Sequence, residues 1–238
     1  MALPFLYPTE TRLYVPSPLR YDIVMPNPQG STLMLALDLA GTFAFGLSGG
    51  LVGVRARLDL FGIIFLAGVV GLVGGITRDI LLDALPPATF SDWRYLVAAA
   101  AAGLVAFFAR PTLDRFSRPV GLFDAAGLSL FCVTGATKAL DFDMGPVQAV
   151  VLGAITAVGG GMLRDILVRD IPMVLRSELY AVPALAGATI IVVASWIGHQ
   201  SPAIAIIAAA VCFLIRTAGM RFDLGLPTAP SERGKPDE

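Results

Sequence analysis

The sequence contains one glycine-rich octapeptide twice, first as Gly74-Gly75-Ile76-Thr77-Arg78-Asp79-Ile80-Leu81 and then as Gly160-Gly161-Met162-Leu163-Arg164-Asp165-Ile166-Leu167. The two copies lie 86 residues apart, and each sets an Arg-Asp pair shortly after a Gly-Gly pair within an apolar stretch. The organisation of the chain follows from this duplication of a segment that is both glycine-rich and charged.

Other residues repeat at the same offset, and no gap is needed anywhere between Asp38 and Pro86. The matched pairs are Asp38-Leu39-Ala40-Gly41 with Asp124-Ala125-Ala126-Gly127, Phe45 with Phe131, Ser48-Gly49 with Thr134-Gly135, and Pro86 with Pro172. A chance alignment of two apolar helices would match Leu, Ala and Val, whereas this one matches Asp, Gly, Arg and Pro. We therefore interpret the chain as an internal repeat.

The composition is that of a membrane protein. Hydrophobic residues make up 56% of the 238 residues and charged residues only 15%, which is far from the balance of a soluble domain. A net charge of −1 argues against nucleic-acid binding, which needs a basic surface. Cys132 and Cys212 both lie in apolar segments, so the sequence predicts neither a disulfide nor a zinc site from them.

Apolar runs long enough to cross a bilayer as helices predict the fold class. We expect seven of them, at residues 33–54, 58–83, 94–110, 120–140, 145–169, 179–198 and 202–219. Because each copy has three helices, an odd number, the second copy enters the membrane from the opposite side. The sequence thus predicts an all-α membrane protein with seven transmembrane helices, arranged as two inverted three-helix repeats plus a seventh helix.

The runs divide the chain into five segments. These are a Pro-rich extracytoplasmic arm (1–32), the first three-helix repeat (33–110), the second three-helix repeat (120–198), the seventh transmembrane helix (202–219) and a disordered cytoplasmic tail (220–238).

Basic residues near the helix ends predict the orientation, because they collect on the cytoplasmic side. One face carries Arg55, Arg57, Arg110, Arg115, Arg118, Arg169, Arg176, Arg216 and Arg221, and the other carries only Arg12, Arg20, Arg94 and Lys138. The first face is expected to be cytoplasmic, with the N-terminus outside and the C-terminus inside. The expected interfacial aromatic residues are Trp93, Tyr95 and Trp196 at the outer boundary and Tyr180 at the inner one.

Glycine runs occupy both the second and the fifth helix. They are Gly71, Gly74 and Gly75 in the second helix, and Gly159, Gly160 and Gly161 in the fifth. Glycine adopts conformations closed to other residues, so these runs predict a bend or an unwound segment. Non-helical backbone is tolerated at membrane depth where it lines a polar cavity. The alternative is that small residues let neighbouring helices approach closely.

Six charged residues are expected at membrane depth: Asp38, Arg78, Asp79, Asp124, Arg164 and Asp165. Burying each costs about 2.5–3.5 kcal/mol on insertion scales, so they should be paired or hydrated. The rise of a helix places Asp38 and Arg78 near one membrane face and Asp124 and Arg164 near the other. The expected couples are therefore Asp38–Arg78 and Asp124–Arg164, with Arg78 roughly 20 Å from Asp165. Such pairs can line a pore, clamp helices together, or do both.

Lys138 breaks the repeat, because its counterpart in the first copy is Val52. It is expected near the outer end of the fourth helix, just before Asp141, where it either snorkels to the interface or sets a fixed positive charge at the outer mouth of a pore. Ser48 and Thr134 are matched hydroxyls. They either replace part of the hydration shell of an ion or hydrogen-bond the backbone of their own helix.

Taken together, these motifs resemble a known family. The features are two three-helix copies, each with Gly-Gly-x-x-Arg-Asp-x-Leu, a Lys in the fourth helix within Gly135-Ala136-Thr137-Lys138, and a solitary seventh helix. Over residues 33–219 the chain resembles the prokaryotic branch of the trimeric intracellular cation channel family, a bacterial inner-membrane group also labelled as glycine transporters.

The resemblance implies a homotrimer in the lipids of the inner membrane, in which each subunit has its own pore for K⁺ and Na⁺ lined by the second and fifth helices. It implies no cofactor, only permeant K⁺ or Na⁺ in the pore. The first copy has Val73 where the second has Gly159, so a weaker bend is expected there. Lys138 is followed by Ala139-Leu140, unlike the Lys-Glu-Val of eukaryotic members, so lipid gating of their kind is not expected.

The sequence leaves three functions open. Passive conduction of monovalent cations is favoured by the symmetric glycine runs and the charges at membrane depth. Transport of a small solute such as glycine is the alternative, because inverted repeats with broken helices also build transporter sites. An interaction scaffold with purely structural charge pairs is the third. The sequence shows no nucleophile–base group, and its single His, His199, lies at a helix end, so neither an enzyme nor a metal site is predicted.

Overall fold

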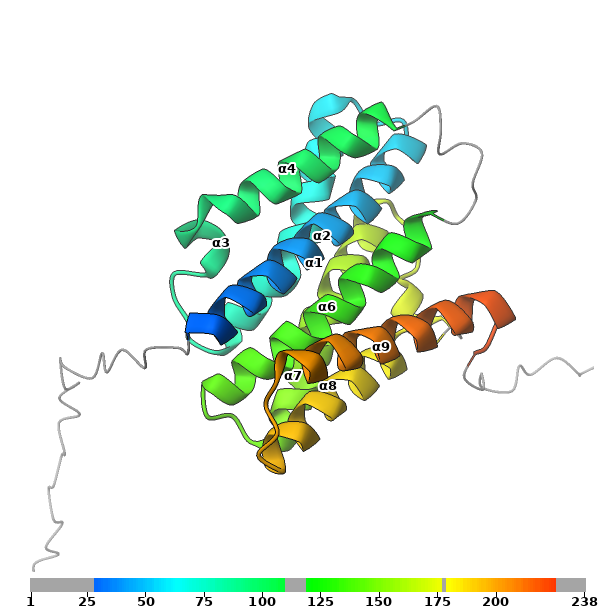
Figure 1. The fold of residues 1–238 in the computed structure, drawn as a ribbon. Helices are drawn as coiled ribbons and strands as arrows, with labels where there is room; N and C mark the ends of the chain where they lie inside the picture. The colour runs from blue at the N-terminus through cyan, green and yellow to red at the C-terminus, as the bar shows by residue number, and fades with distance from the viewer. Residues whose placement is uncertain (1–27, 110–118, 177–178, 226–238) are drawn as a thin grey trace, which may run out of the picture.

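The computed structural model describes residues 28–109, 119–176 and 179–225, and within them the chain forms helices joined by loops (Figure 1). The described elements are α1 (Pro28–Arg55), α2 (Leu60–Leu81), α3 (Ala88–Ser91), α4 (Trp93–Phe108), α6 (Pro119–Asp141), α7 (Pro146–Leu167), the 3-10 helix η1 (Met173–Leu175), α8 (Ala181–Trp196) and α9 (Pro202–Phe222). Most of the predicted N-terminal arm and C-terminal tail lie outside the described residues.

Seven of these helices coincide with the seven predicted apolar runs. By length and composition α1, α2, α6, α7 and α9 are able to cross a membrane, whereas α4 and α8 are apolar but have 16 residues each. A 16-residue helix is about 24 Å long, shorter than the roughly 30 Å hydrocarbon core. The chain is thus an all-α membrane protein with five long apolar spans among its described residues. α1 also begins at Pro28, a few residues earlier than predicted.

Four non-glycine residues with left-handed backbone follow the helices at matched positions. Arg57 (φ 58°) after α1 corresponds to Asp143 (φ 57°) after α6, and Asp83 (φ 55°) after α2 corresponds to Arg169 (φ 62°) after α7. Each pair is 86 residues apart, so the two halves of the chain end their helices with the same backbone conformation. The side chain charge is reversed within each pair.

α1 and α6 lie side by side at the centre of the bundle and run in opposite directions (Figure 1). Their contact is reciprocal. A Cβ added to Gly41 would lie 2.6 Å from the Phe131 ring, and a Cβ added to Gly127 would lie 2.5 Å from the Phe45 ring. The two rings also pack together, with centroids 5.4 Å apart. Each phenylalanine therefore fills the space that a glycine of the other helix leaves open.

The glycines of α2 and α7 also make a reciprocal contact, and they do so within continuous helices. A Cβ on Gly74 would collide with the Thr156 carbonyl oxygen, and a Cβ on Gly160 would collide with the Val70 carbonyl oxygen. The helices therefore do not unwind at the glycines, whereas a bend within the helix stays a prediction. Both backbones stay helical because the glycines relieve a close helix–helix approach instead.

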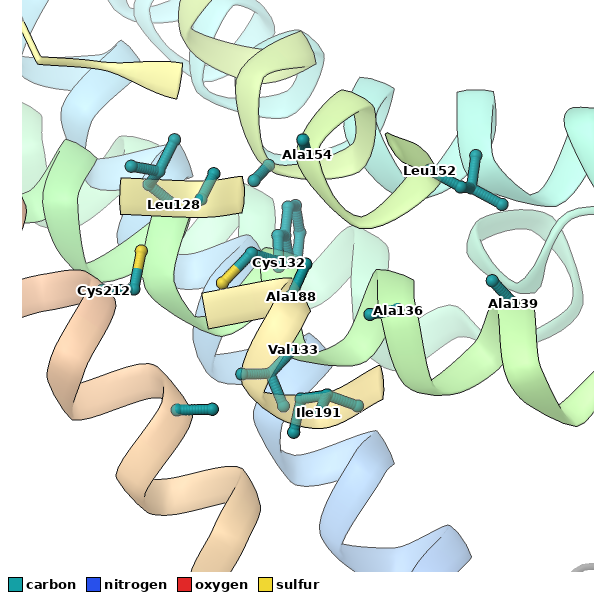
Figure 2. Packing of buried hydrophobic residues seen from close by; sticks show 14 of the residues in the cluster. Leu128, Cys132, Val133, Ala136, Ala139, Leu152, Ala154, Ala188, Ile191 and Cys212 are labelled. Carbon is teal, nitrogen blue, oxygen red and sulfur yellow. The ribbon is translucent and has the colours of Figure 1, made fainter. Parts of the chain in front are cut away.

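The second half of the chain has the larger apolar core, where α6 meets α7, α8 and α9. Figure 2 shows Cys132 and Val133 of α6 beside Ala188 and Ile191 of α8, with Cys212 of α9 close by. Cys132 and Cys212 are both buried and unpaired as thiols. They pack as small hydrophobic residues, as the sequence predicts. This core packs α9 against the second half, and among the described helices α6 and α8 make its main contacts.

Candidate functional site

One end of the bundle holds the first ion-pair cluster, which we define as Asp38, Arg78, Asp79, Tyr95 and Lys138. Arg78 Nη1 lies 3.0 Å from Asp38 Oδ1, and Arg78 Nε lies 2.8 Å from Asp79 Oδ1. All three side chains are buried. The predicted Asp38–Arg78 couple is confirmed, and the adjacent Asp79 joins it.

Further donors saturate the two carboxylates of the first cluster. The Tyr95 hydroxyl donates to Asp38 Oδ2 over 3.2 Å, and Lys138 Nζ lies 2.8 Å from Asp79 Oδ1. The backbone N–H of Ala88, the first residue of α3, donates to Asp79 Oδ2 over 2.9 Å. Two carboxylates therefore face two cations, so the first cluster has a formal charge of zero.

The second ion-pair cluster consists of Ser48, Asp124, Arg164, Asp165 and Tyr180. Arg164 Nη1 lies 2.7 Å from Asp124 Oδ1, and Arg164 Nη2 lies 2.8 Å from Asp165 Oδ1. Each of these charged side chains is buried. The predicted Asp124–Arg164 couple is confirmed, and it too includes the neighbouring aspartate.

Hydroxyl groups and a backbone N–H complete the second cluster. Arg164 Nη1 donates to Ser48 Oγ over 2.6 Å, and the Tyr180 hydroxyl donates to Asp124 Oδ1 over 3.1 Å. The N–H of Met173, which begins η1, donates to Asp165 Oδ2 over 2.9 Å. Among the described residues Asp124 Oδ2 has no hydrogen-bond partner. Two carboxylates here face one arginine, so the cluster has a formal charge of −1.

Charged side chains at membrane depth can stay there only when they are paired, and both clusters meet this requirement. Asp79 and Asp165 each bind the N–H at the start of a short helix, where a carboxylate is favourable. The first cluster joins α1, α2, α3, α4 and α6, and the second joins α1, α6, α7, η1 and the residue before α8.

The structure gives Lys138 a partner and changes the predicted placement of Tyr95, Tyr180 and Ser48. Lys138 lies in the last turn of α6, near the helix end as predicted, and it pairs there with Asp79 of the other half. Tyr95 and Tyr180 are not interfacial residues, because their rings are buried and their hydroxyls bind aspartates. Ser48 does not hydrogen-bond its own helix, since it accepts from Arg164 and donates to the carbonyl oxygen of Val120 over 3.4 Å, and its contact with a permeant ion stays a prediction.

Two further residues differ from expectation. Thr134, the counterpart of Ser48, is buried, and its hydroxyl has no hydrogen-bond partner among the described residues. Arg216, which the sequence assigned to the cytoplasmic face, is fully buried within α9.

A small enclosed cavity adjoins the first cluster. It has a volume of about 10 Å³ and is lined in part by Asp38, Thr42, Gly75, Arg78 and Tyr95, which suits about one water molecule. At the equivalent place in the second cluster, the Tyr180 hydroxyl occupies the space that a Cβ on Gly161 would take. In the described ranges no group of three or more His, Cys, Asp or Glu residues is arranged to hold a metal ion.

Sequence reasoning missed Tyr95 and Tyr180 as partners of the aspartates, although a weak signal exists. The tyrosines lie 57 and 56 residues from Asp38 and Asp124 respectively, so a repeat aligned without gaps does not match them. The signal for Arg216 was its position inside an apolar run of α9.

Comparison with known proteins identifies the family. A family model described as "Glycine transporter" matches residues 35–111 and 121–196. The chain belongs to this family. The two matched segments begin 86 residues apart, the offset of the sequence repeat, and together they cover the six helices other than α9 that coincide with predicted spans.

Relatives of similar length extend the comparison. A UPF0126 membrane protein of Streptomyces coelicolor is 53% identical over 201 residues, which cover 84% of this chain and 92% of the relative. The UPF0126 inner membrane protein YadS of Escherichia coli strain K12 is 36% identical over 208 residues, covering 85% and 100%. The family protein described here is likewise a multi-pass inner-membrane protein.

A solved structure gives the same fold. The TRIC trimeric intracellular cation channel orthologue from Rhodobacter sphaeroides is 37% identical, with a TM-score of 0.76 over 81% of this chain and 100% of that chain. The two proteins therefore share one architecture over nearly all of the described helices.

Proposed function

We propose that the protein is a channel for monovalent cations, K⁺ and Na⁺, with one pore in each protomer of a homotrimer. The observation that carries this proposal is the likeness to the Rhodobacter sphaeroides cation channel, at 37% identity over the whole of that chain. A shared fold alone would not suffice, but here it comes with buried ion-pair clusters on helices suited to line a pathway.

The channel is proposed to form from two inverted three-helix repeats. Reciprocal contacts support this arrangement: Gly41 meets Phe131 while Phe45 meets Gly127, and the glycine contacts of α2 and α7 follow the same rule. A contact pattern in which i meets j and j meets i is what a two-fold axis produces. Since α1 and α6 run in opposite directions, that axis lies in the membrane plane.

The pathway is proposed to run along α2 and α7 between the two clusters, with Ser48, Thr134 and Lys138 at its walls. Each cluster would close one end in the structure described here. The formal charge of −1 at the second cluster favours cations, because charge rings of one sign select ions of the other. Conduction then requires that ion pairs separate or rearrange, so the clusters are the proposed gates.

Transport of glycine or a similar small solute is the second candidate, and the description of the matching family model favours it. The two functions predict different measurements. A channel reconstituted in planar bilayers passes unitary K⁺ currents, whereas a transporter gives saturable uptake of labelled glycine into proteoliposomes without matching conductance.

The deciding experiment measures both quantities on one preparation. Purified trimer should give unitary K⁺ currents in bilayers, and labelled glycine should not accumulate above the level in protein-free liposomes. Asp124→Asn serves as the matched variant, because it alters the second cluster without a large change in volume and should change the open fraction. Silent bilayers together with saturable glycine uptake would replace the channel proposal with the transporter.

We also propose that the ends carrying Arg57 and Arg169 face the cytoplasm, while Asp83 and Asp143 face outward. The reversal of charge at these matched turns follows the positive-inside rule. Single cysteines at Arg115 and Asp141, in a variant lacking Cys132 and Cys212, should react with impermeant reagents from the inside and the outside respectively. Labelling with the opposite sidedness would exchange the two mouths.

A further inference from the structure

Arg216 of α9 is buried as completely as the two arginines of the repeat, with no exposed surface. The helix that carries it belongs to neither three-helix copy. A fully buried arginine at membrane depth is costly, and such a residue in a helix outside the repeat calls for a specific role.

Among the described residues, the guanidinium of Arg216 contacts Tyr180, Leu179 and Met173 near the second cluster. Its central carbon lies 4.7 Å from the centroid of the Tyr180 ring, a cation–π arrangement that is strongest where water is excluded. Nη1 donates to the carbonyl oxygen of Leu179 over 3.2 Å, and Nη2 lies 3.7 Å from Met173 Sδ. Arg216 therefore holds both the segment that leads into α8 and the start of η1.

The two residues that Arg216 contacts by their side chains are those that complete the second cluster. Tyr180 donates its hydroxyl to Asp124, and Met173 donates its backbone N–H to Asp165. One arginine of the seventh helix thus supports the donors to both carboxylates that bind Arg164. The link passes through direct contacts at every step, from α9 to the ion pair on α7.

The first cluster has the same tyrosine and backbone donors but a different support. Tyr95 and Ala88 take the roles of Tyr180 and Met173, yet no cation stacks on Tyr95 among the described residues. The space beside Tyr95 is instead the small cavity of about 10 Å³. The two clusters share their chemistry and differ in what braces them.

We propose that Arg216 is a positioning residue that keeps the second ion-pair cluster in its closed arrangement. Its contacts hold Tyr180 and Met173 in place, so that both keep their hydrogen bonds to the carboxylates that bind Arg164. The seventh helix then acts as a brace for one gate. One part of this inference depends on the proposed channel function, namely that the protein does not conduct ions while the second cluster is closed.

Hydrogen exchange tests the structural part of the proposal without any need for conduction. In the trimer held in lipid nanodiscs, Arg216→Met should speed amide exchange in the peptide 168–176 about tenfold and leave the peptide 84–92 unchanged. Arg221→Met is the matched control, because Arg221 lies exposed on the same helix and should change neither peptide. Unchanged exchange at 168–176, or equal acceleration of both peptides, would overturn the role of Arg216.

Single-channel recording tests the functional part. Arg216→Met and Tyr180→Leu should each raise the open fraction about tenfold at unchanged unitary conductance, and the double variant should add little because both remove one contact. Arg216→Lys keeps a cation near the Tyr180 ring, so its open fraction should lie between those of the natural protein and of Arg216→Met. It replaces Arg216→Met in the test if the methionine variant does not fold. Additive effects would contradict the proposal. Silent bilayers with unaltered protein would overturn the channel function, and the exchange measurement would still decide the role of Arg216.

Discussion

The two ion-pair clusters are built from the same repeat, yet they differ in their charge and in their support. The first cluster balances Asp38 and Asp79 with two cations, Arg78 and Lys138, whereas among the described residues the second pairs its two carboxylates with one cation, Arg164. The second cluster gains instead a serine from α1 and a brace from α9. The charge pairs are therefore common to both clusters, while the residues around them differ.

This comparison predicts that the second cluster depends more heavily on its arginine. Arg164→Ala leaves two buried carboxylates without a cation in the cluster and should lower the free energy of unfolding by about 3–5 kcal/mol. Arg78→Ala should cost less, because Lys138 remains beside Asp79. Denaturant titration of the protein in mixed micelles would measure both values. Equal losses would show that Lys138 does not support the first cluster.

Double-mutant cycles test the assignment of partners within this comparison. Arg164→Ala combined with Asp124→Asn should cost less than the sum of the single variants by about 0.5–3 kcal/mol, because each change removes the same interaction. Arg78→Ala combined with Asp165→Asn should be additive within about 0.5 kcal/mol, since the two residues belong to different clusters. Strong coupling in that second cycle would mean that the clusters meet at one central site.

The glycine contacts should be equally sensitive in both copies. Gly74→Ala and Gly160→Ala each drive a methyl group into a backbone carbonyl of the facing helix, so we expect losses of about 1–3 kcal/mol in unfolding free energy. Gly68→Ala is the matched control in α2, because nothing lies within 4 Å of its added Cβ. It should stabilise the helix by up to about 1 kcal/mol. A loss confined to one copy would break the proposed symmetry.

The smallest expected effect comes from giving the second cluster the lysine that it lacks. Val52 is half-buried and matches Lys138, so Val52→Lys should bring a cation to Asp165 and change the unfolding free energy by less than about 1 kcal/mol. Its signature is a coupling of about 0.5–1 kcal/mol with Asp165→Asn in the same titration. Val52→Met, of similar length without charge, is the control and should show no coupling.

The couples Asp38–Arg78 and Asp124–Arg164 could be predicted because helical rise and the repeat place each pair at one depth. Lys138 with Asp79, and Ser48 with Arg164, could not. These contacts join the two copies, so they depend on how α1 and α6 cross and rotate about their axes. That geometry follows from the packing of Phe45 and Phe131 on the opposing glycines, which no periodicity in either helix specifies.

The glycine runs are a second case in which the sequence does not decide the local structure. A missing Cβ permits either a distorted backbone or a close helix contact, and the sequence of Gly159-Gly160-Gly161 is compatible with both. In the tertiary structure the Val70 carbonyl lies against Gly160, and the α7 backbone remains helical there. The glycine therefore serves a close contact between helices.

The sequence by itself determined the membrane class, the seven apolar runs, the repeat offset and the two buried charge couples, because hydropathy and helical rise are local properties. Only the tertiary structure decided which half supplies each remaining donor, and that Arg216 reaches Tyr180 from a helix outside the repeat. The physical reason is that hydrogen bonds and cation–π contacts between distant segments depend on side-chain positions to within a few tenths of an ångström, which only the packed helices provide.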